Sequence, residues 1–158
     1  MNSALKIVAG GQTGVDRAAL EWALANGVPH GGWCPKGRKA EDGIIPPQFQ
    51  FRETGSSNYS IRTRRNVRDS GGTVVFSERA ELTGGTKETA EFAKAIGKPL
   101  LQLVSSAGIQ ETATQLNCFL KEHGIVVLNV AGPRASEQPE VSQFVKAVLS
   151  HALKSLVR

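Results

Sequence analysis

The sequence predicts one α/β domain of the Rossmann-like kind, a three-layer sandwich with helices on both faces of a mainly parallel sheet. Three observations predict this fold class. Apolar runs too short for helices alternate with segments of helical period. A glycine-rich turn follows the first apolar run and opens a helix. No linker, repeat or low-complexity tract divides the 158 residues, so we expect residues 1–158 to form a single ligand-binding domain.

Strands are expected where branched apolar residues cluster between turn signals. The first such run, LKIVA, ends directly at a pair of glycines, and the last, IVVLNV, is followed by a Gly-Pro pair. The expected strands are residues 5–9, 49–52, 73–76, 100–104 and 125–130.

Helices are expected where apolar residues recur at spacings of three and four. The first carries Val15 to Trp22 and stops at Gly27. The last has the longest apolar stripe, from Val141 to Leu156, with Ser136 as its N-cap. The helices between them are expected at about 60–69, 86–96 and 109–120.

Composition narrows the class of protein further. With 40% hydrophobic residues the chain supports a core, which excludes disordered, collagen-like and disulfide-rich classes. Cys34 and Cys118 form no CxxC pair, as expected in a reducing cytoplasm. The first apolar run breaks at glycines, so we expect neither a signal peptide nor a membrane span. The 19 basic against 14 acidic residues give a charge of +5 and favour an anionic partner.

The first glycine turn, GGQTGVDR, is a candidate anion site. Glycines let the backbone approach an anion, and the N–H groups at the start of the next helix can bind its oxygens. The spacing matches neither the dinucleotide fingerprint nor a P-loop. Thr13 and Asp16 also fit a capping box, in which case they would only start the helix. The residues of this turn are Gly10, Gly11, Gln12, Thr13 and Gly14.

A second Gly-Gly turn, LTGGTKET, opens a later helix and carries a lysine that can neutralise charge. Because parallel strands end at the same edge of a sheet, we expect both turns to meet around one phosphate-bearing ligand; otherwise they are two ordinary tight turns. A bulky residue at Gly11 or Gly85 should then remove binding while the domain still folds. The candidate residues here are Ser77, Gly84, Gly85, Thr86, Lys87 and Glu88.

Residues 30–70 form an insertion that is too long for a simple connection, which favours a ligand-facing role. Its end, YSIRTRRNVRD, has four arginines in seven positions, which suit phosphate or carboxylate but can equally form a solvated basic face. On a helix we expect Ile61 to face the core with Arg65 beside it. Arg134 follows the last strand and should reach the same edge of the sheet.

No residue is assigned a catalytic or metal-ligating role. Cys34 has no His or Cys at ligand spacing and is expected to be a buried structural residue. The three histidines are scattered. Asp42, Asp69 and Glu88 remain candidates for acid–base chemistry without an identifiable pairing.

Five ordered motifs together resemble one known family. GGQTGVDRAAL, WCPKGRKAEDG, RTRRNVRDS, LTGGTKET and NVAGPR are similar to the molybdenum carrier, or molybdenum cofactor carrier, family. This family lies within the Rossmann-like group of the lysine-decarboxylase-like phosphoribohydrolases and DNA-processing protein A. The resemblance implies a homo-oligomer, often described as a tetramer, that binds and protects the molybdenum cofactor, a pyranopterin phosphate with molybdenum, as its cargo. It places the two glycine turns at the cofactor, together with Arg62, Arg64 and Asn66.

Two other functions remain open. The first is a nucleotide-processing enzyme of the phosphoribohydrolase type, acting on a nucleoside monophosphate. The resemblance weakens it, because Thr89 stands where the PGGxGTxxE signature has its glutamate, and Glu88 is one position early. The second is a nucleic-acid module built on the arginine cluster. We do not expect nucleic acid as a partner, because only Tyr59 accompanies that cluster for base stacking.

Overall fold

The computed structural model describes residues 5–156 and shows an α/β sandwich built on a five-stranded sheet. All neighbouring strands in this sheet pair in parallel, in the order β2-β1-β9-β7-β8. The carboxyl ends of the strands therefore lie along one edge. The strands are β1 (Lys6–Val8), β2 (His30–Gly31), β7 (Gly72–Ser77), β8 (Leu100–Val104) and β9 (Val127–Ala131).

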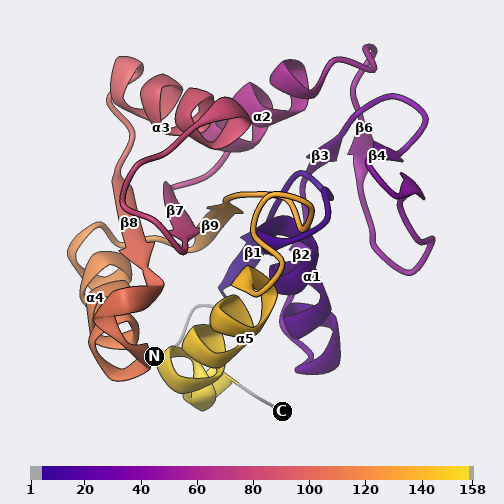
Figure 1. Cartoon of the computed structure of the whole chain (residues 1–158). Helices are drawn as coiled ribbons and strands as arrows, with labels where there is room; N and C mark the ends of the chain where they lie inside the picture. Colours follow the sequence, from indigo (N-terminus) through magenta and orange to yellow (C-terminus); the bar gives the residue numbers. More distant parts are fainter. Residues whose placement is uncertain (1–4, 157–158) are drawn as a thin grey trace.

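Helices cover both faces of the sheet, as the sequence predicts (Figure 1). α1 (Val15–Ala25), α4 (Ile109–Glu122) and α5 (Val141–Ala152) pack side by side on one face. α2 (Tyr59–Arg68) and α3 (Gly84–Ala95) pack together on the other. The three-layer, Rossmann-like prediction is thus confirmed.

The main core lies between the sheet and the α1–α5–α4 layer. α5 supplies its apolar stripe, with Val145, Val148 and Leu149 fully buried. Phe144 meets Phe76 of strand β7 edge to face, with ring centroids 5.6 Å apart. Burying such large side chains supplies most of the folding free energy of a domain of this size. The core therefore fixes the rigid sheet whose edge carries the polar residues.

Residues between β2 and α2 form a small lobe beside the sheet. It contains a parallel pair, β3 (Trp33–Cys34) with β6 (Arg52–Glu53), and an antiparallel hairpin, β4 (Lys39–Ala40) with β5 (Gly43–Ile44). The strand expected at 49–52 thus begins only at its last residue. Cys34, buried as expected, packs in a second apolar cluster with Ile45 and Phe49. Burial raises the pKa of its thiol, which opposes formation of a reactive thiolate.

Two expectations about helix faces and ends are wrong. In α2 the residues buried besides Val67 are Arg62 and Asn66, whereas Ile61 is only half-buried. Ser136 does not cap the last helix, because α5 begins at Val141 and its preceding residue makes no side-chain cap. Helix α5 also ends at Ala152, and the 3₁₀ turns Ser105–Ala107 and Lys154–Leu156 complete the described elements.

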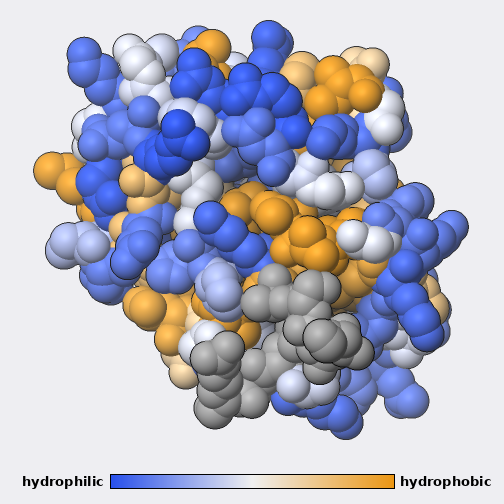
Figure 2. All heavy atoms as spheres, turned by 180° about the vertical axis from the view of Figure 1, so that it is seen from behind, coloured by the Kyte–Doolittle hydropathy of each residue, from blue (hydrophilic) through white to orange (hydrophobic). Residues whose placement is uncertain are grey.

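The surface seen from behind is mostly hydrophilic, with hydrophobic side chains exposed near its centre and in smaller groups elsewhere (Figure 2). In the part of the chain that is described, no helix is long and apolar enough to cross a membrane.

Candidate ligand-binding cleft

A cleft of about 650 Å³, counted with its open mouth, lies at the edge where the strands end. Four segments form its walls: the turn between β1 and α1, helix α2, helix α3, and the end of β9 with the chain that follows it. The edge of a parallel sheet is where ligands bind in this class of fold. The two glycine turns, distant in the sequence, therefore share one cleft, with Gly10 and Gln12 from the first and Gly85 and Thr86 from the second.

Gln12 is the side chain of the first turn that lines the cleft and has an unpaired polar group. It is 5% exposed, and its Oε1 accepts the backbone N–H groups of Thr13 (3.1 Å) and Glu41 (2.8 Å). Because these two donors identify the oxygen, the other end of the amide is the NH₂ group. Within residues 5–156 the buried Nε2 has no hydrogen-bond partner. Gln12 therefore offers a donor to a ligand.

Gly11 and Gly14 serve the fold rather than line the cleft. Gly11 has φ +87°, and a Cβ there would lie 2.5 Å from Cδ1 of Ile45, in the apolar cluster of the lobe. Gly14 has φ +82°, and a Cβ there would lie 2.4 Å from the carbonyl oxygen of Pro133. Both positions need glycine for backbone conformation and for space. The expectation that a bulky residue at Gly11 would leave the fold intact is therefore wrong.

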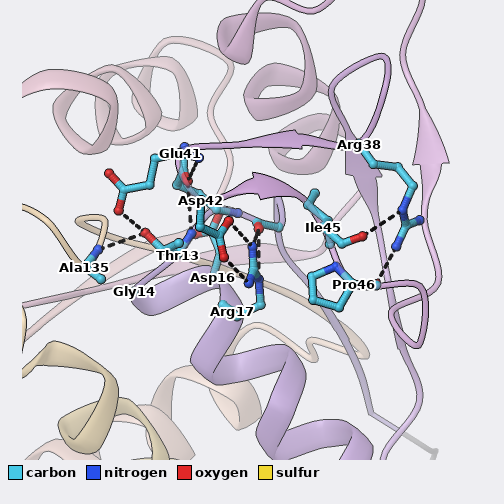
Figure 3. Close-up of polar contacts among 12 residues, drawn as sticks. Thr13, Gly14, Asp16, Arg17, Arg38, Glu41, Asp42, Ile45, Pro46 and Ala135 are labelled. Carbon is cyan, nitrogen blue, oxygen red and sulfur yellow. Dashed lines mark hydrogen bonds and ion pairs between the residues drawn. The ribbon is translucent and has the colours of Figure 1, made fainter.

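The β4–β5 hairpin is tied to the first turn by its two carboxylates (Figure 3). Glu41 accepts hydrogen bonds from the hydroxyl of Thr13 and from Ser136, at 2.6 Å from Oγ. These bonds, with that from Ser136 contributing most, lower the pKa of Glu41. Arg17 donates to both carboxylate oxygens of Asp42, at 3.0 and 3.1 Å, and lowers the pKa of Asp42. The hairpin thereby holds the turn that presents Gln12.

The capping-box alternative for the first turn is wrong for Thr13. Gly14 precedes α1 and no side chain caps the helix. The hydroxyl of Thr13 instead binds Glu41 and accepts the backbone N–H of Ala135 at 3.1 Å. Asp16 does accept the backbone N–H of Gln12, at 3.3 Å, but its side chain also lines the cleft.

Helix α2 contributes Arg62 and Asn66 to the cleft wall. Arg62 is buried and donates to the carbonyls of Gly10 (3.4 Å) and Tyr59 (3.1 Å) and to the hydroxyl of Thr63. Asn66 uses its amide to hold the backbone of Trp33, accepting its N–H at 2.8 Å and donating to its carbonyl at 3.0 Å.

The other predicted site residue of α2 lies elsewhere. Arg64 is exposed, with its guanidinium 5.5 Å from the ring centroid of Phe92, and it does not line the cleft. Arg65 stacks on Trp33 at 4.7 Å. The arginines of this helix therefore point in several directions.

Helix α3 presents one face to the cleft, from the second glycine turn onward. Gly85, Glu88 and Thr89 line it, as the spacing of three and four residues requires, together with Thr86. A Cβ at Gly85 would meet open space. Among the described residues the buried Oε1 of Glu88 has no hydrogen-bond partner.

Three residues predicted near the second turn lie outside this cleft. Lys87 points from α3 to solvent and Gly84 is exposed at the helix start. Ser77 lines a smaller neighbouring pocket, which shares Thr86, and its hydroxyl donates to the carbonyl of Arg79 at 2.7 Å.

The charges of the cleft are partly hidden from water. Asp16 is 7% exposed, and burial raises its pKa to about 6 even though the nearby Arg62 opposes the shift. Burial likewise lowers the pKa of Arg62. At the rim, three cations surround the ring of Tyr59: Lys39 at 4.5 Å, Arg62 at 5.1 Å and Arg134 at 5.5 Å from its centroid. These three side chains bring positive charge to the rim.

Several residues that line the cleft are not among the site residues predicted from the sequence. Tyr59 is the ring that gathers the cations, and Thr89 follows Gly85 by one helical turn. Asn129 is a polar residue inside an apolar strand, and this is the signal that could have identified it; its amide donates to the hydroxyl of Thr73 at 3.2 Å. Within residues 5–156 no group of three or more His, Cys, Asp or Glu side chains could hold a metal ion.

The fold and the cleft define a Rossmann-like domain that presents glycine turns, a free amide donor and cations to a ligand at the sheet edge. The chain belongs to the circularly permutated YpsA SLOG family, whose model matches residues 7–153. It is also similar to a crystal structure described as "Putative molybdenum carrier protein" from Syntrophus aciditrophicus SB. That structure is 45% identical in sequence, has a TM-score of 0.92, and is matched over 95% of this chain and 96% of its own. These findings confirm the family resemblance. The search of curated proteins gave no significant match.

Proposed function

We propose that the protein binds and protects the molybdenum cofactor as a non-catalytic carrier in the cytoplasm. One observation carries the proposal: both glycine turns line a single cleft in a chain 45% identical to a structure described as a molybdenum carrier. The cofactor joins a phosphate and an oxomolybdenum group to a flat pterin. Its anionic groups suit Arg62, Arg134 and the open start of α3 at Gly85, where unpaired backbone N–H groups favour anions.

The proposal is tested by the oxidative decay of released cofactor. Decay should slow when purified protein is added in excess, because the bound pterin is withdrawn from oxygen and water. Gly85→Leu, which places a side chain in the cleft, should remove the protection, whereas Lys87→Leu, two positions along on the exposed side of α3, should keep it. Unchanged decay with wild-type protein would reject the proposal.

A second function is favoured by two acidic groups in the same cleft. Glu88 has a buried unpaired oxygen, and the pKa of Asp16 is raised to about 6, which suits general acid–base catalysis near neutral pH. This supports a nucleotide-processing enzyme of the phosphoribohydrolase type. A screen of nucleoside monophosphates for release of free base tests it, with Glu88→Gln and Asp16→Asn as inactive controls. If no nucleotide is cleaved, the enzymatic function loses its support.

We also propose that the protein is a homo-oligomer, following the family resemblance. The hydrophobic area on the back surface is the kind of surface that subunit contacts bury (Figure 2). Light scattering coupled to size-exclusion chromatography measures the assembly directly. A tetramer is expected, and a monomer at micromolar concentration would contradict the proposal.

A further inference from the structure

The cleft contains two unpaired buried groups of opposite hydrogen-bonding character. Nε2 of Gln12, on the first turn, is a donor, and Oε1 of Glu88, on α3, is an acceptor. Burying such groups without partners is unfavourable, so a ligand that satisfies both gains affinity. The occupant should therefore carry an acceptor for Gln12 and an N–H donor for Glu88.

Gln12 cannot exchange these roles by turning its amide. Its oxygen already accepts two backbone N–H groups, those of Thr13 and Glu41, and a flipped amide would place NH₂ against both donors. The second of these donors belongs to the β4–β5 hairpin, which Glu41 and Asp42 tie to the turn. The hairpin thus fixes Gln12 as a donor.

Glu88 argues against a simple oxyanion as the occupant of the inner cleft. An unprotonated oxyanion such as molybdate has only acceptor oxygens and would be repelled by a carboxylate, so it can use the cationic rim at Tyr59 but leaves Oε1 of Glu88 unpaired. A heterocycle with adjacent N–H groups pairs with a carboxylate through two hydrogen bonds. The 2-amino-4-oxopyrimidine ring, shared by pterins and guanine, has such an edge.

We infer that Glu88 recognises the 2-amino-4-oxopyrimidine edge of the ligand, while Gln12 donates to an acceptor on the same ligand. The inference rests on the proposed function, since it identifies the part of the cargo that the cleft selects. It makes the intact pterin-bearing cofactor, rather than free molybdate, the native occupant. The phosphate then faces the cations around Tyr59.

The test compares pterin with lumazine, in which an oxo group replaces the 2-amino group, by fluorescence titration. Wild-type protein should bind pterin at least about tenfold more tightly, because a site built for an N–H donor rejects a ligand that lacks it. In Glu88→Gln the ratio of pterin affinity to lumazine affinity should fall to one or below, since an amide can pair with the donor and acceptor of lumazine. Glu91→Gln, an exposed glutamate on the same helix, should keep the wild-type ratio. Circular dichroism checks that each variant is folded.

A further probe, guanosine, which like pterin carries no phosphate, separates the two sources of the ring. Tighter binding of pterin than of guanosine supports the cofactor; tighter binding of guanosine overturns the assignment to a pterin. Equal affinity for pterin and lumazine, no binding of any probe, or an unchanged ratio in Glu88→Gln overturns the inference even if the protein still protects released cofactor. A pterin preference without protection instead rejects the carrier function and leaves the role of Glu88 standing.

Discussion

Asp16 and Arg62 form a buried pair of opposite charges that one short turn holds in place. Arg62 donates to the carbonyl of Gly10, and Asp16 accepts the backbone N–H of Gln12. Burial outweighs the attraction of the guanidinium and raises the pKa of Asp16 to about 6. The charge on the inner wall of the cleft therefore changes near neutral pH.

Anion binding should consequently tighten as the pH falls from 8 to 5. Neutral Asp16 no longer repels an anion or offsets the charge of Arg62. Sulfate is a suitable probe because it does not titrate in this range, and its dissociation constant can be measured by calorimetry. Asp16→Asn should bind sulfate with little pH dependence; a variant that keeps the wild-type dependence would assign the effect to another group.

The same group should make folding stability depend on pH. Because the folded-state pKa lies above the usual value of 3.8, protonated Asp16 stabilises the fold. This stabilisation is fully present below about pH 4 and is lost as the pH rises through about 6. The loss is on the order of 2–3 kcal/mol. Urea denaturation at pH 4, 6 and 8 measures it, with Asp16→Asn as the flat control. If the free energy of unfolding changes equally with pH in wild type and in Asp16→Asn, Asp16 does not titrate as described.

Two glycines with similar sequence surroundings should respond differently to alanine. Gly85 lies in the first turn of α3 with open space around its Cβ position, so Gly85→Ala should stabilise the fold by about 0.5–1 kcal/mol. Gly11→Ala should destabilise it by about 1–3 kcal/mol, because φ is +87° and Ile45 is 2.5 Å from the new atom. Thermal denaturation compares the two. Equal effects would contradict the structure of the first turn.

Substitution by lysine should likewise have different effects at two arginines of α2. Arg62→Lys loses the planar fork that donates to Gly10 and Tyr59, and should cost about 1–3 kcal/mol of stability as well as anion affinity. Arg64→Lys, at an exposed position outside the cleft, should change either quantity by less than about 0.5 kcal/mol. A loss of anion binding in Arg64→Lys would show that Arg64 belongs to the binding site.

Weakening the hydrogen bonds to Glu41 should make the β4–β5 hairpin more mobile. Glu41→Gln weakens the bonds from Thr13 and Ser136, so amides of residues 39–44 should exchange with deuterium faster. Asp42→Asn, which removes the ion pair with Arg17, tests the second contact between the hairpin and the rest of the domain. Because these bonds lower the pKa of Glu41, acid should loosen the wild-type hairpin only below the usual range of a glutamate. Unchanged exchange in both variants would show that the hairpin is held by other contacts.

The strands and helices of the sandwich follow from local patterns, which is why the sequence predicts most of them. Strand β8 coincides with the apolar run at 100–104, and β7 and α4 differ only at their ends. The buried face of α2 could not be predicted in the same way. Arg62 and Asn66 are acceptable inside because Gly10 and Trp33, from other parts of the chain, satisfy their hydrogen bonds.

The candidate site, too, could be predicted only in part from the sequence. The convergence of the two turns follows from the parallel sheet, which alternation of strands and helices predicts. The direction of each side chain does not follow. Lys87 and Glu88 are adjacent in the sequence, but the helix turns one to solvent and the other to the cleft. Gly11 and Ser136 have their partners, Ile45 and Glu41, in the lobe, and no local period indicates such contacts.

The position of β9 has a consequence for how the molecule assembles. It is the last strand in the sequence, yet it lies in the middle of the sheet and separates the β2-β1 pair from the β7-β8 pair. During synthesis the two pairs must wait for residues 127–131 before they can join, and until then β1 and β7 each expose a strand edge that can aggregate. Pairing that depends on such distant segments is intrinsically slow. We therefore expect the cleft at the sheet edge to be completed as one of the final events of folding.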